Sequence, residues 1–240
     1  MHPNAFIHLP NLRDRLTPPD RSELRVTPEV MAFWDERARS LGRTPDWRLT
    51  DRQIEESRCA LVGELDPGRD VWIFSYGSLM WDPGFHFEEV RLAELDGFQR
   101  RFSFRSSVGR GSPERPALML SLERCAGMCT GLAFRILGSI ADVETAIIWR
   151  REMVRGSYRP LLQPARTPQG EITSIVFGPN PDHADHVGQL PLADTARIIA
   201  SASGVLGSNR QYLEQLAAQL EGLQIEDPYV TALLAQVRTL

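Results

Sequence analysis

The spacing of apolar and polar residues changes along this chain and separates a helical beginning from a strand-rich middle. From about residue 71 to residue 178, short apolar runs lie between turn-rich loops, a pattern typical of β-strands. Strands are expected near 71–76, 98–104, 117–122, 129–136 and 172–178. Helices are expected near 140–154, 191–202, 208–222 and 228–238. This mixture predicts an α+β fold.

The first part of the chain is predicted to be a helical extension, with a boundary between 1–68 and 69–240. Thr27 is suited to cap a first helix that Pro28 opens and Gly42 follows. An apolar stripe on this helix is expected to be buried against the main domain or at a dimer contact, and comprises Val30, Phe33, Trp34, Ala38 and Leu41. Nothing in the extension indicates chemistry.

A second helix is expected within the extension. Thr50 and Gln53 have the spacing of a capping box, in which each side chain bonds the backbone N–H of the other residue. This helix is predicted to end before the turn Asp66-Pro67-Gly68.

Composition limits the protein class. A chain of 240 residues with 42% hydrophobic residues can bury a full core as one domain plus an appendage. No apolar run approaches membrane-spanning length, so we expect a soluble, cytoplasmic protein and no membrane partner. The net charge of −4 argues against a nucleic-acid partner. Three cysteines, Cys59, Cys125 and Cys129, are expected to be reduced thiols.

The absence of lysine removes several mechanisms. All 27 basic residues are arginines. Schiff-base chemistry, a lysine general base and a phosphate-binding P-loop lysine are therefore excluded.

The stretch 71–81 is the most informative in the chain. The first expected strand breaks at Ser75-Tyr76-Gly77-Ser78, where a turn exposes successive backbone N–H groups. Gly77 allows the main chain to approach a ligand closely, and successive N–H groups form a concavity for a carboxylate or a polarised carbonyl oxygen. An ordinary strand-to-loop turn has the same pattern, so spacing alone leaves both interpretations open.

The helix expected near 140–154 carries a candidate general base. Its apolar residues predict burial around most of its circumference, and include Val143, Ala146, Ile147, Ile148 and Trp149. Glu152 follows Ile148 and Trp149 by about one turn and lies on the same side. Burial there raises the pKa of a carboxyl group toward neutrality, which suits a base. The alternative is a solvated helix-end glutamate paired with Arg151 or Arg155.

Several segments, taken in order, carry a family resemblance. The loop Tyr76-Gly77-Ser78-Leu79 with Trp81 is followed by 97–102, 110–116, 131–135, 151–158, 180–182 and 207–213. This ordered set resembles the γ-glutamylcyclotransferase superfamily, and most of all its ChaC branch, which acts on glutathione. The resemblance covers most of the chain after residue 69.

The resemblance implies a small, mostly antiparallel β-barrel with surrounding helices and an enzyme that needs no metal or organic cofactor. The family's catalytic glutamate lies in an Arg-Glu pair before a Gly-x-Tyr, which here is Arg151-Glu152 before Gly156-Ser157-Tyr158. Glu152 is thus expected to transfer protons while the substrate's α-amino group attacks its own γ-amide carbonyl. The products from glutathione are 5-oxoproline and cysteinylglycine.

Substrate binding is expected to involve the loop and several further side chains. The loop residues are Ile73, Phe74, Ser75, Tyr76, Gly77, Ser78 and Leu79. Main-chain N–H groups around residues 75–79 are expected to hold the γ-glutamyl part of the substrate and to polarise its carbonyl. The hydroxyl groups of Tyr76 and Tyr158 are candidates for bonds to substrate or to Glu152, and wall packing is equally compatible with both.

Arginines around a Gly/Pro loop are candidates for the glycyl carboxylate of glutathione. They are Arg105, Arg110 and Arg115, of which we select Arg110, although a solvated loop accounts for at least two of them. Tyr212 is a candidate for closing the pocket or, alternatively, a core aromatic residue.

Two departures from the family pattern leave the substrate open. Ser75 stands where a glycine is common, and the long extension is absent from compact members. Three interpretations follow: a glutathione-degrading cyclotransferase, a cyclotransferase for other γ-glutamyl peptides or amines, and a non-enzymatic binding protein on the same barrel. The partner is expected to be a small-molecule substrate, and the protein a monomer or homodimer.

Overall fold

The computed structural model describes residues 3–65 and 68–240. Asp66 and Pro67 of the expected turn lie outside the described residues. Contacts divide the chain into two compact units, the first made of 1–95 and 130–178 and the second of 96–129 and 179–240. The domain boundary expected between residues 68 and 69 stays a prediction.

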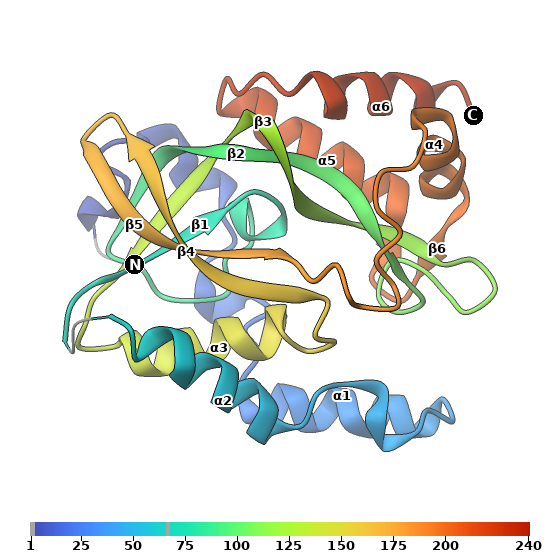
Figure 1. Cartoon of the computed structure of the whole chain (residues 1–240), viewed down its shortest axis with the longest axis horizontal. Helices are drawn as coiled ribbons and strands as arrows, with labels where there is room; N and C mark the ends of the chain where they lie inside the picture. Colours follow the sequence, from blue (N-terminus) through green and yellow to red (C-terminus); the bar gives the residue numbers. More distant parts are fainter. Residues whose placement is uncertain (1–2, 66–67) are drawn as a thin grey trace. The chain divides into compact units, whose positions relative to one another are not determined.

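A closed β-barrel organises the fold (Figure 1). Its strands, in the order β1-β3-β2-β4-β5, are β1 (Val71–Ser75), β3 (Ala117–Ile136), β2 (Glu89–Ser106), β4 (Tyr158–Thr167) and β5 (Gly170–Pro179). β1 runs antiparallel to β3, with Val71 opposite Ile136, and parallel to β5, with Ile73 opposite Ile175. The expected α+β fold with a mostly antiparallel barrel is therefore confirmed.

The strands are longer than the apolar runs that predicted them. The two segments expected at 117–122 and 129–136 belong to the single strand β3, and the strand expected at 98–104 begins already at Glu89. β4 was not expected, because Pro160 and Pro164 interrupt its pattern and most of its side chains are only half-buried.

The first unit contains α1 (Pro28–Ser40), α2 (Asp51–Val62) and α3 (Ala141–Glu152). Thr27 caps α1, and Thr50 and Gln53 form the predicted capping box of α2. α2 packs against α3, as Figure 1 shows. The stripe predicted on α1 was partly wrong, because Phe33 and Leu41 are 62% and 65% exposed. This helix buries a narrower face, with Met31 and Ala38 in the core.

Short 3-10 helices complete the extension and the turn after β1. They span Pro3–Phe6, Pro10–Arg15, Pro19–Arg21, Pro45–Trp47 and Ser78–Met80. Each of the first four has a proline at or near its start, where the fixed φ of proline suits the first helical position.

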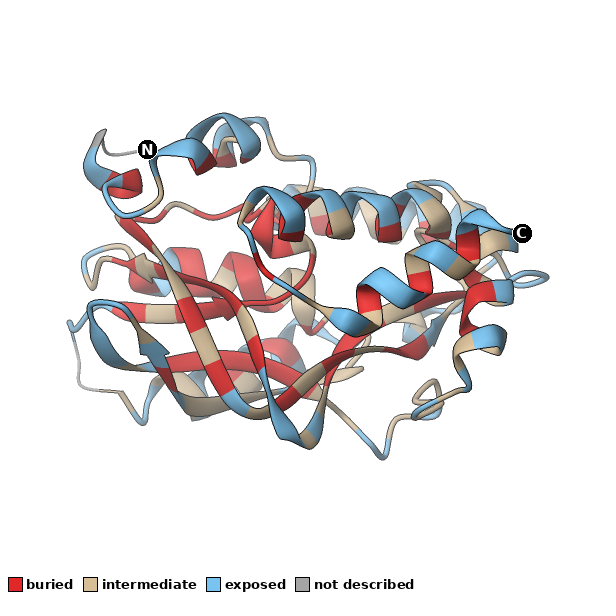
Figure 2. Ribbon diagram, turned by 90° about the horizontal axis from the view of Figure 1, so that it is seen from above, coloured by how far each residue is buried: buried red, intermediate tan, exposed pale blue. Residues whose placement is uncertain are grey.

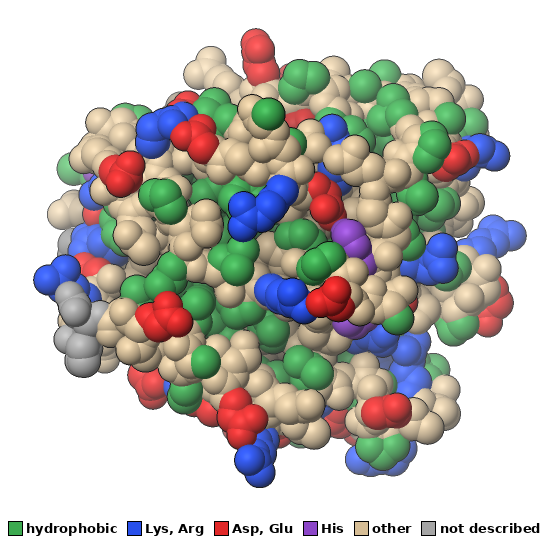
Figure 3. Space-filling view, in the orientation of Figure 1, with side chains coloured by type: hydrophobic (Ala, Val, Ile, Leu, Met, Phe, Trp, Pro, Cys, Tyr) green, Lys and Arg blue, Asp and Glu red, His purple; other side chains and the backbone are tan. Residues whose placement is uncertain are grey.

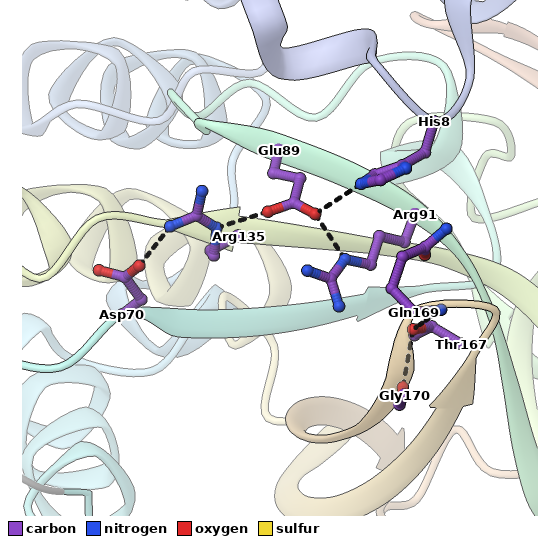
Figure 4. Close-up of polar contacts among 8 residues, drawn as sticks. All are labelled: His8, Asp70, Glu89, Arg91, Arg135, Thr167, Gln169 and Gly170. Atoms are coloured by element: carbon purple, nitrogen blue, oxygen red, sulfur yellow. Dashed lines mark hydrogen bonds and ion pairs between the residues drawn. The ribbon is translucent and has the colours of Figure 1, made fainter.

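The extension packs on the barrel within the first unit, one of the two arrangements expected for it. The Phe6 ring meets the Phe87 ring edge-to-face at 5.8 Å between centroids. His8 Nε2 lies 3.1 Å from Glu89 Oε1, and Glu89 also binds Arg91 and Arg135 (Figure 4). These apolar and polar contacts hold Phe6 and His8 against Phe87 and Glu89, the first residue of β2.

The second unit contains three helices that pack on one another: α4 (Leu192–Ser201), α5 (Asn209–Gly222) and α6 (Pro228–Arg238). The short strands β6 (Ser203–Gly204) and β7 (Gly207–Ser208) form a hairpin before α5. Asn209 is buried, and its side chain bonds both the N–H and the carbonyl of Leu118. Along each helix, buried and exposed residues alternate with helical spacing, as Figure 2 shows.

The described residues show how charges are distributed on one face and what state the cysteines are in. On the face shown in Figure 3, basic and acidic side chains are interspersed. In the part of the chain that the structure describes, no helix has both the length and the apolar character to cross a membrane. All three cysteines are free, with Cys59 exposed, Cys125 half-buried and Cys129 buried.

Candidate active site

The turn after β1 places a row of main-chain groups at the end of the strand. β1 ends at Ser75, and a single 3-10 turn follows at Ser78–Met80. Within the described residues, the N–H groups of Gly77 and Ser78 donate to no protein acceptor. Gly131 on β3 permits the close approach of this segment, because a Cβ there would collide with the Ser75 carbonyl oxygen.

Most predicted loop residues turn their side chains into the core. Ile73, Phe74 and Ser75 are at most 1% exposed, and Leu79 is also buried. Ile73, Phe74 and Leu79 have no polar side-chain atoms, so only their backbone groups can hydrogen-bond a substrate. Their role in binding stays a prediction.

Tyr76 uses its hydroxyl group within the protein. The hydroxyl donates a 2.7 Å hydrogen bond to the carbonyl oxygen of Phe177 on β5. The Phe177 ring in turn meets the Trp149 ring edge-to-face at 5.0 Å between centroids. This chain of contacts joins the turn after β1 to α3 through the barrel wall.

Glu152 is the last residue of α3, and its side chain is only 15% exposed. Burial raises the pKa of the Glu152 carboxyl group above its ordinary value of 4.5, and the neighbouring Arg151 opposes this shift. The negative end of the helix dipole also disfavours a carboxylate at this position. The carboxyl group is therefore largely buried beside a cation, and is not a solvated helix end; its role as a general base stays a prediction.

Arg151 connects Glu152 to the turn after β1. Its Nε lies 3.3 Å from Glu152 Oε1, and its Nη2 donates a 3.0 Å hydrogen bond to Ser78 Oγ. Its Nη1 donates to the carbonyl oxygens of Asp82 and Pro83 at 2.6 and 3.3 Å. One guanidinium group, 8% exposed, thus brings together the two features that the sequence singled out.

The burial predicted for α3 was wrong at one position. Val143 is 59% exposed, whereas the adjacent Glu144 is 4% exposed. Glu144 is buried because it accepts a bidentate pair from Arg25, at 2.7 and 2.8 Å, and a bond from the His86 N–H. A carboxylate with these partners is stable in the interior where an unpaired one is not.

Three further side chains were candidates for substrate binding. Tyr158 is the first residue of β4 and is half-buried. Arg110 and Tyr212 belong to the second unit, where the guanidinium of Arg110 lies 5.9 Å from the Tyr212 ring centroid. Tyr212 is 5% exposed and packs edge-to-face on Phe102, so it has the contacts of a core aromatic residue. Desolvation lowers the pKa of Arg110.

The sequence pattern assigns no role to two residues that the structure places near Glu152 or on its helix, Arg151 and Glu144. For Arg151, the position next to Glu152 in the Arg-Glu pair is a usable signal. Glu144 had no signal of its own, because its burial depends on Arg25, 119 positions away. In the residues that the structure describes, no three His, Cys, Asp or Glu side chains gather as a metal site.

The barrel and its helices have a γ-glutamylcyclotransferase-like fold. The crystal structure of a yeast γ-glutamyl cyclotransferase specific to glutathione superposes with a TM-score of 0.65, covering 71% of this chain and 96% of that one. The sequence identity is 22%, so this likeness concerns the fold.

The chain belongs to the family of ChaC-like proteins, whose family model matches residues 71–240. The glutathione-specific γ-glutamylcyclotransferase of Escherichia coli K12 is 38% identical over 175 residues, which cover 71% of this chain and 74% of the relative. Human glutathione-specific γ-glutamylcyclotransferase 1 is 30% identical over 176 residues, or 71% of this chain and 79% of the relative. The family match begins at Val71 and leaves the extension outside.

Proposed function

We propose that this protein is a γ-glutamylcyclotransferase that cleaves glutathione to 5-oxoproline and cysteinylglycine, with Glu152 as general base and acid. The relatives that carry this activity in their names support the reaction. The observation that supports the site is the connection of Glu152 through Arg151 to Ser78 in the turn after β1.

The reaction is an intramolecular transfer. Glu152 removes a proton from the substrate's α-ammonium group, and the freed nitrogen attacks the γ-carbonyl carbon to close a five-membered ring. The amide C–N bond then breaks as Glu152 returns the proton to the departing amine, and the ring nitrogen loses its second proton to water, which leaves the neutral amide of 5-oxoproline. Proton transfer of this kind contributes roughly 10²–10⁴-fold to the rate, and fixing the ring-closing conformer contributes further.

The turn after β1 is suited to stabilise the developing negative charge on the carbonyl oxygen. The N–H groups of Gly77 and Ser78 lack protein acceptors within the described residues, so they are available to a ligand. Fixed N–H donors at such a position stabilise an oxyanion more than water does, because they need no reorganisation. Ser78 is held in place by its bond from Arg151.

Release of 5-oxoproline and cysteinylglycine from glutathione tests the proposal. The wild type is compared with Glu152→Gln and with Glu94→Gln, a control on β2 whose carboxyl group is 41% exposed and 3.3 Å from Arg166. We expect turnover by the wild type and the control, and a loss of about a hundredfold or more in Glu152→Gln.

Other outcomes identify which part of the proposal is wrong. Equal turnover by the wild type and Glu152→Gln rejects Glu152 as the base. Turnover of other γ-glutamyl peptides or amines, but not of glutathione, rejects the substrate and retains the ring closure. Failure of the folded wild type with every γ-glutamyl compound leaves a binding protein on the same barrel.

A further inference from the structure

The extension, residues 3–65, contacts α3 and its flanking loops on both sides of Glu152. Trp149 Nε1 donates to Ser57 Oγ at 3.3 Å, and Arg58 Nη2 lies 2.8 Å from Asp142 Oδ1. These contacts lie along the helix that carries the base.

Arg25 joins α3 to the loop 82–86. Both of its terminal nitrogens bind the Glu144 carboxylate, at 2.7 and 2.8 Å, and Nη1 also donates to the Gly84 carbonyl at 3.1 Å. The same Glu144 accepts a 2.8 Å bond from the His86 N–H. One guanidinium of the extension therefore fixes the helix and the loop against each other.

The loop that Arg25 holds is the loop that Arg151 binds. A Cβ placed on Gly84 would lie 2.9 Å from the Leu24 carbonyl oxygen and 3.3 Å from Arg151 Nη1. Gly84 has a φ of +69°, a conformation that other residues rarely adopt. The chain at Gly84 is thus enclosed between the extension and the guanidinium that binds Glu152 and Ser78.

The extension also holds the segment that follows Glu152. The Leu49 N–H donates a 2.9 Å bond to the carbonyl of Val154, two residues past the helix end. A Leu49 methyl group lies 3.3 Å from the position that a Cβ of Gly156 would occupy. Contacts from one continuous segment therefore constrain the chain before and after the candidate base.

We propose that the extension is a working part of the active site and that Arg25 is a positioning residue, which holds the loop 82–86 so that Arg151 keeps Glu152 and Ser78 in reactive geometry. This inference rests on the proposed function for its kinetic effect. Arg25 acts through Arg151 and touches no reacting atom. The apolar anchor Phe6 contributes stability at a different place, against Phe87.

The first test compares Arg25→Met with a matched control, Arg91→Met. The side chains of Arg25 and Arg91 are 19% and 18% exposed, and each binds a buried glutamate, but Arg91 belongs to the Glu89 cluster of Figure 4. We expect kcat for glutathione to fall roughly 10- to 100-fold in Arg25→Met, the range that a misplacement of about 1 Å produces. KM is expected to change little, and Arg91→Met to keep wild-type kinetics.

A double-mutant cycle with Arg151→Met separates positioning from general stability. If Arg25 acts through Arg151, adding Arg25→Met to Arg151→Met lowers kcat no further. Additive losses, or unchanged kcat in folded Arg25→Met, overturn the proposal. If Arg25→Met does not fold, Arg25→Lys replaces it in the same cycle, because lysine keeps one charged donor and lacks the fork that reaches Gly84.

Hydrogen exchange provides a readout that needs no turnover. Peptides that cover 78–86 and 150–156 are expected to exchange faster in Arg25→Met than in the wild type, and to be unchanged in Arg91→Met. Unchanged exchange in 150–156 overturns the coupling. If the wild type does not act on glutathione, the proposed function fails by itself, and exchange still decides whether Arg25 positions the helix end.

Discussion

Arg151 donates a 3.0 Å hydrogen bond to Ser78 Oγ across 73 positions of sequence. Nε of the same guanidinium lies 3.3 Å from Glu152 Oε1. Arg151 therefore contacts both the base of the proposed reaction and the turn that is proposed to hold the substrate. Because Arg151 contacts both Glu152 and Ser78, it fixes the distance between them and also lowers the pKa of the Glu152 carboxyl group. Changes at Arg151, Ser78 and Glu152 should therefore have distinguishable effects.

The activity of the enzyme should rise with pH through a pKa above 4.5, because Glu152 accepts a proton only when it is ionised and burial raises its pKa. The measurement is kcat/KM for glutathione across the acidic range. An acidic limb at or below the ordinary pKa of glutamate would contradict this environment for the base.

The pH dependence of the protein's stability should also reflect the raised pKa of Glu152. The folded state binds the Glu152 proton more tightly than the unfolded state, so this contribution is fully present below the unfolded pKa of about 4.5 and is lost as pH rises through the folded pKa. Glu152→Gln is neutral throughout. We expect its Tm, measured relative to the wild type, to increase as pH rises through this window; a Tm difference independent of pH would argue against the shift.

Arg151→Met should lower kcat/KM by roughly 10- to 100-fold, since it removes charge-assisted bonds to the turn and loop. It should also move the acidic limb to higher pH, because Arg151 opposes the rise in the pKa of Glu152. Ser78→Ala is the matched variant, which removes one acceptor and keeps the cation beside Glu152. The acidic limb of the Ser78→Ala pH profile should stay at the wild-type position. A shift of the limb in both variants would contradict the effect of the Arg151 charge on the pKa of Glu152.

Gly156→Ala should destabilise the protein by about 1–2 kcal/mol, because Gly156 has a φ of +69° that costs an L-residue about this much. Gly42→Ala is its control, with a φ of +72° and no atom within 4 Å of the added Cβ. If Tm falls more in Gly156→Ala than in Gly42→Ala, the difference is the cost of the steric contact between the new Cβ and Leu49. Equal losses of Tm would mean that the Leu49 side chain moves aside at little cost.

Thiol labelling of the native protein should proceed in a fixed order. Cys59 is exposed and should react first, whereas burial excludes reagent from Cys129 and raises its pKa to about 11. Mass spectrometry after limited alkylation identifies the modified positions. Early labelling of Cys129 would show that this part of β3 opens readily.

Local signals predicted the elements well where a cap or an apolar run acts within a few residues. Thr50 and Gln53 specify the start of α2, and their capping box is present in the structure. The prediction that Phe33 and Leu41 are buried failed, because spacing shows which residues share a face and not whether another element covers it. β4 was missed because barrel closure pairs a strand whose own pattern two prolines interrupt.

The sequence by itself determined the helix caps, the family and the identity of the candidate base, since these depend on residue types at short spacing. Only the tertiary structure decided what surrounds that base. Arg25 meets Glu144 across 119 positions and Arg151 meets Ser78 across 73. No local pattern encodes such pairs, because they form only when barrel closure and the packing of the extension bring distant segments together. The burial that raises the pKa of Glu152 has the same origin.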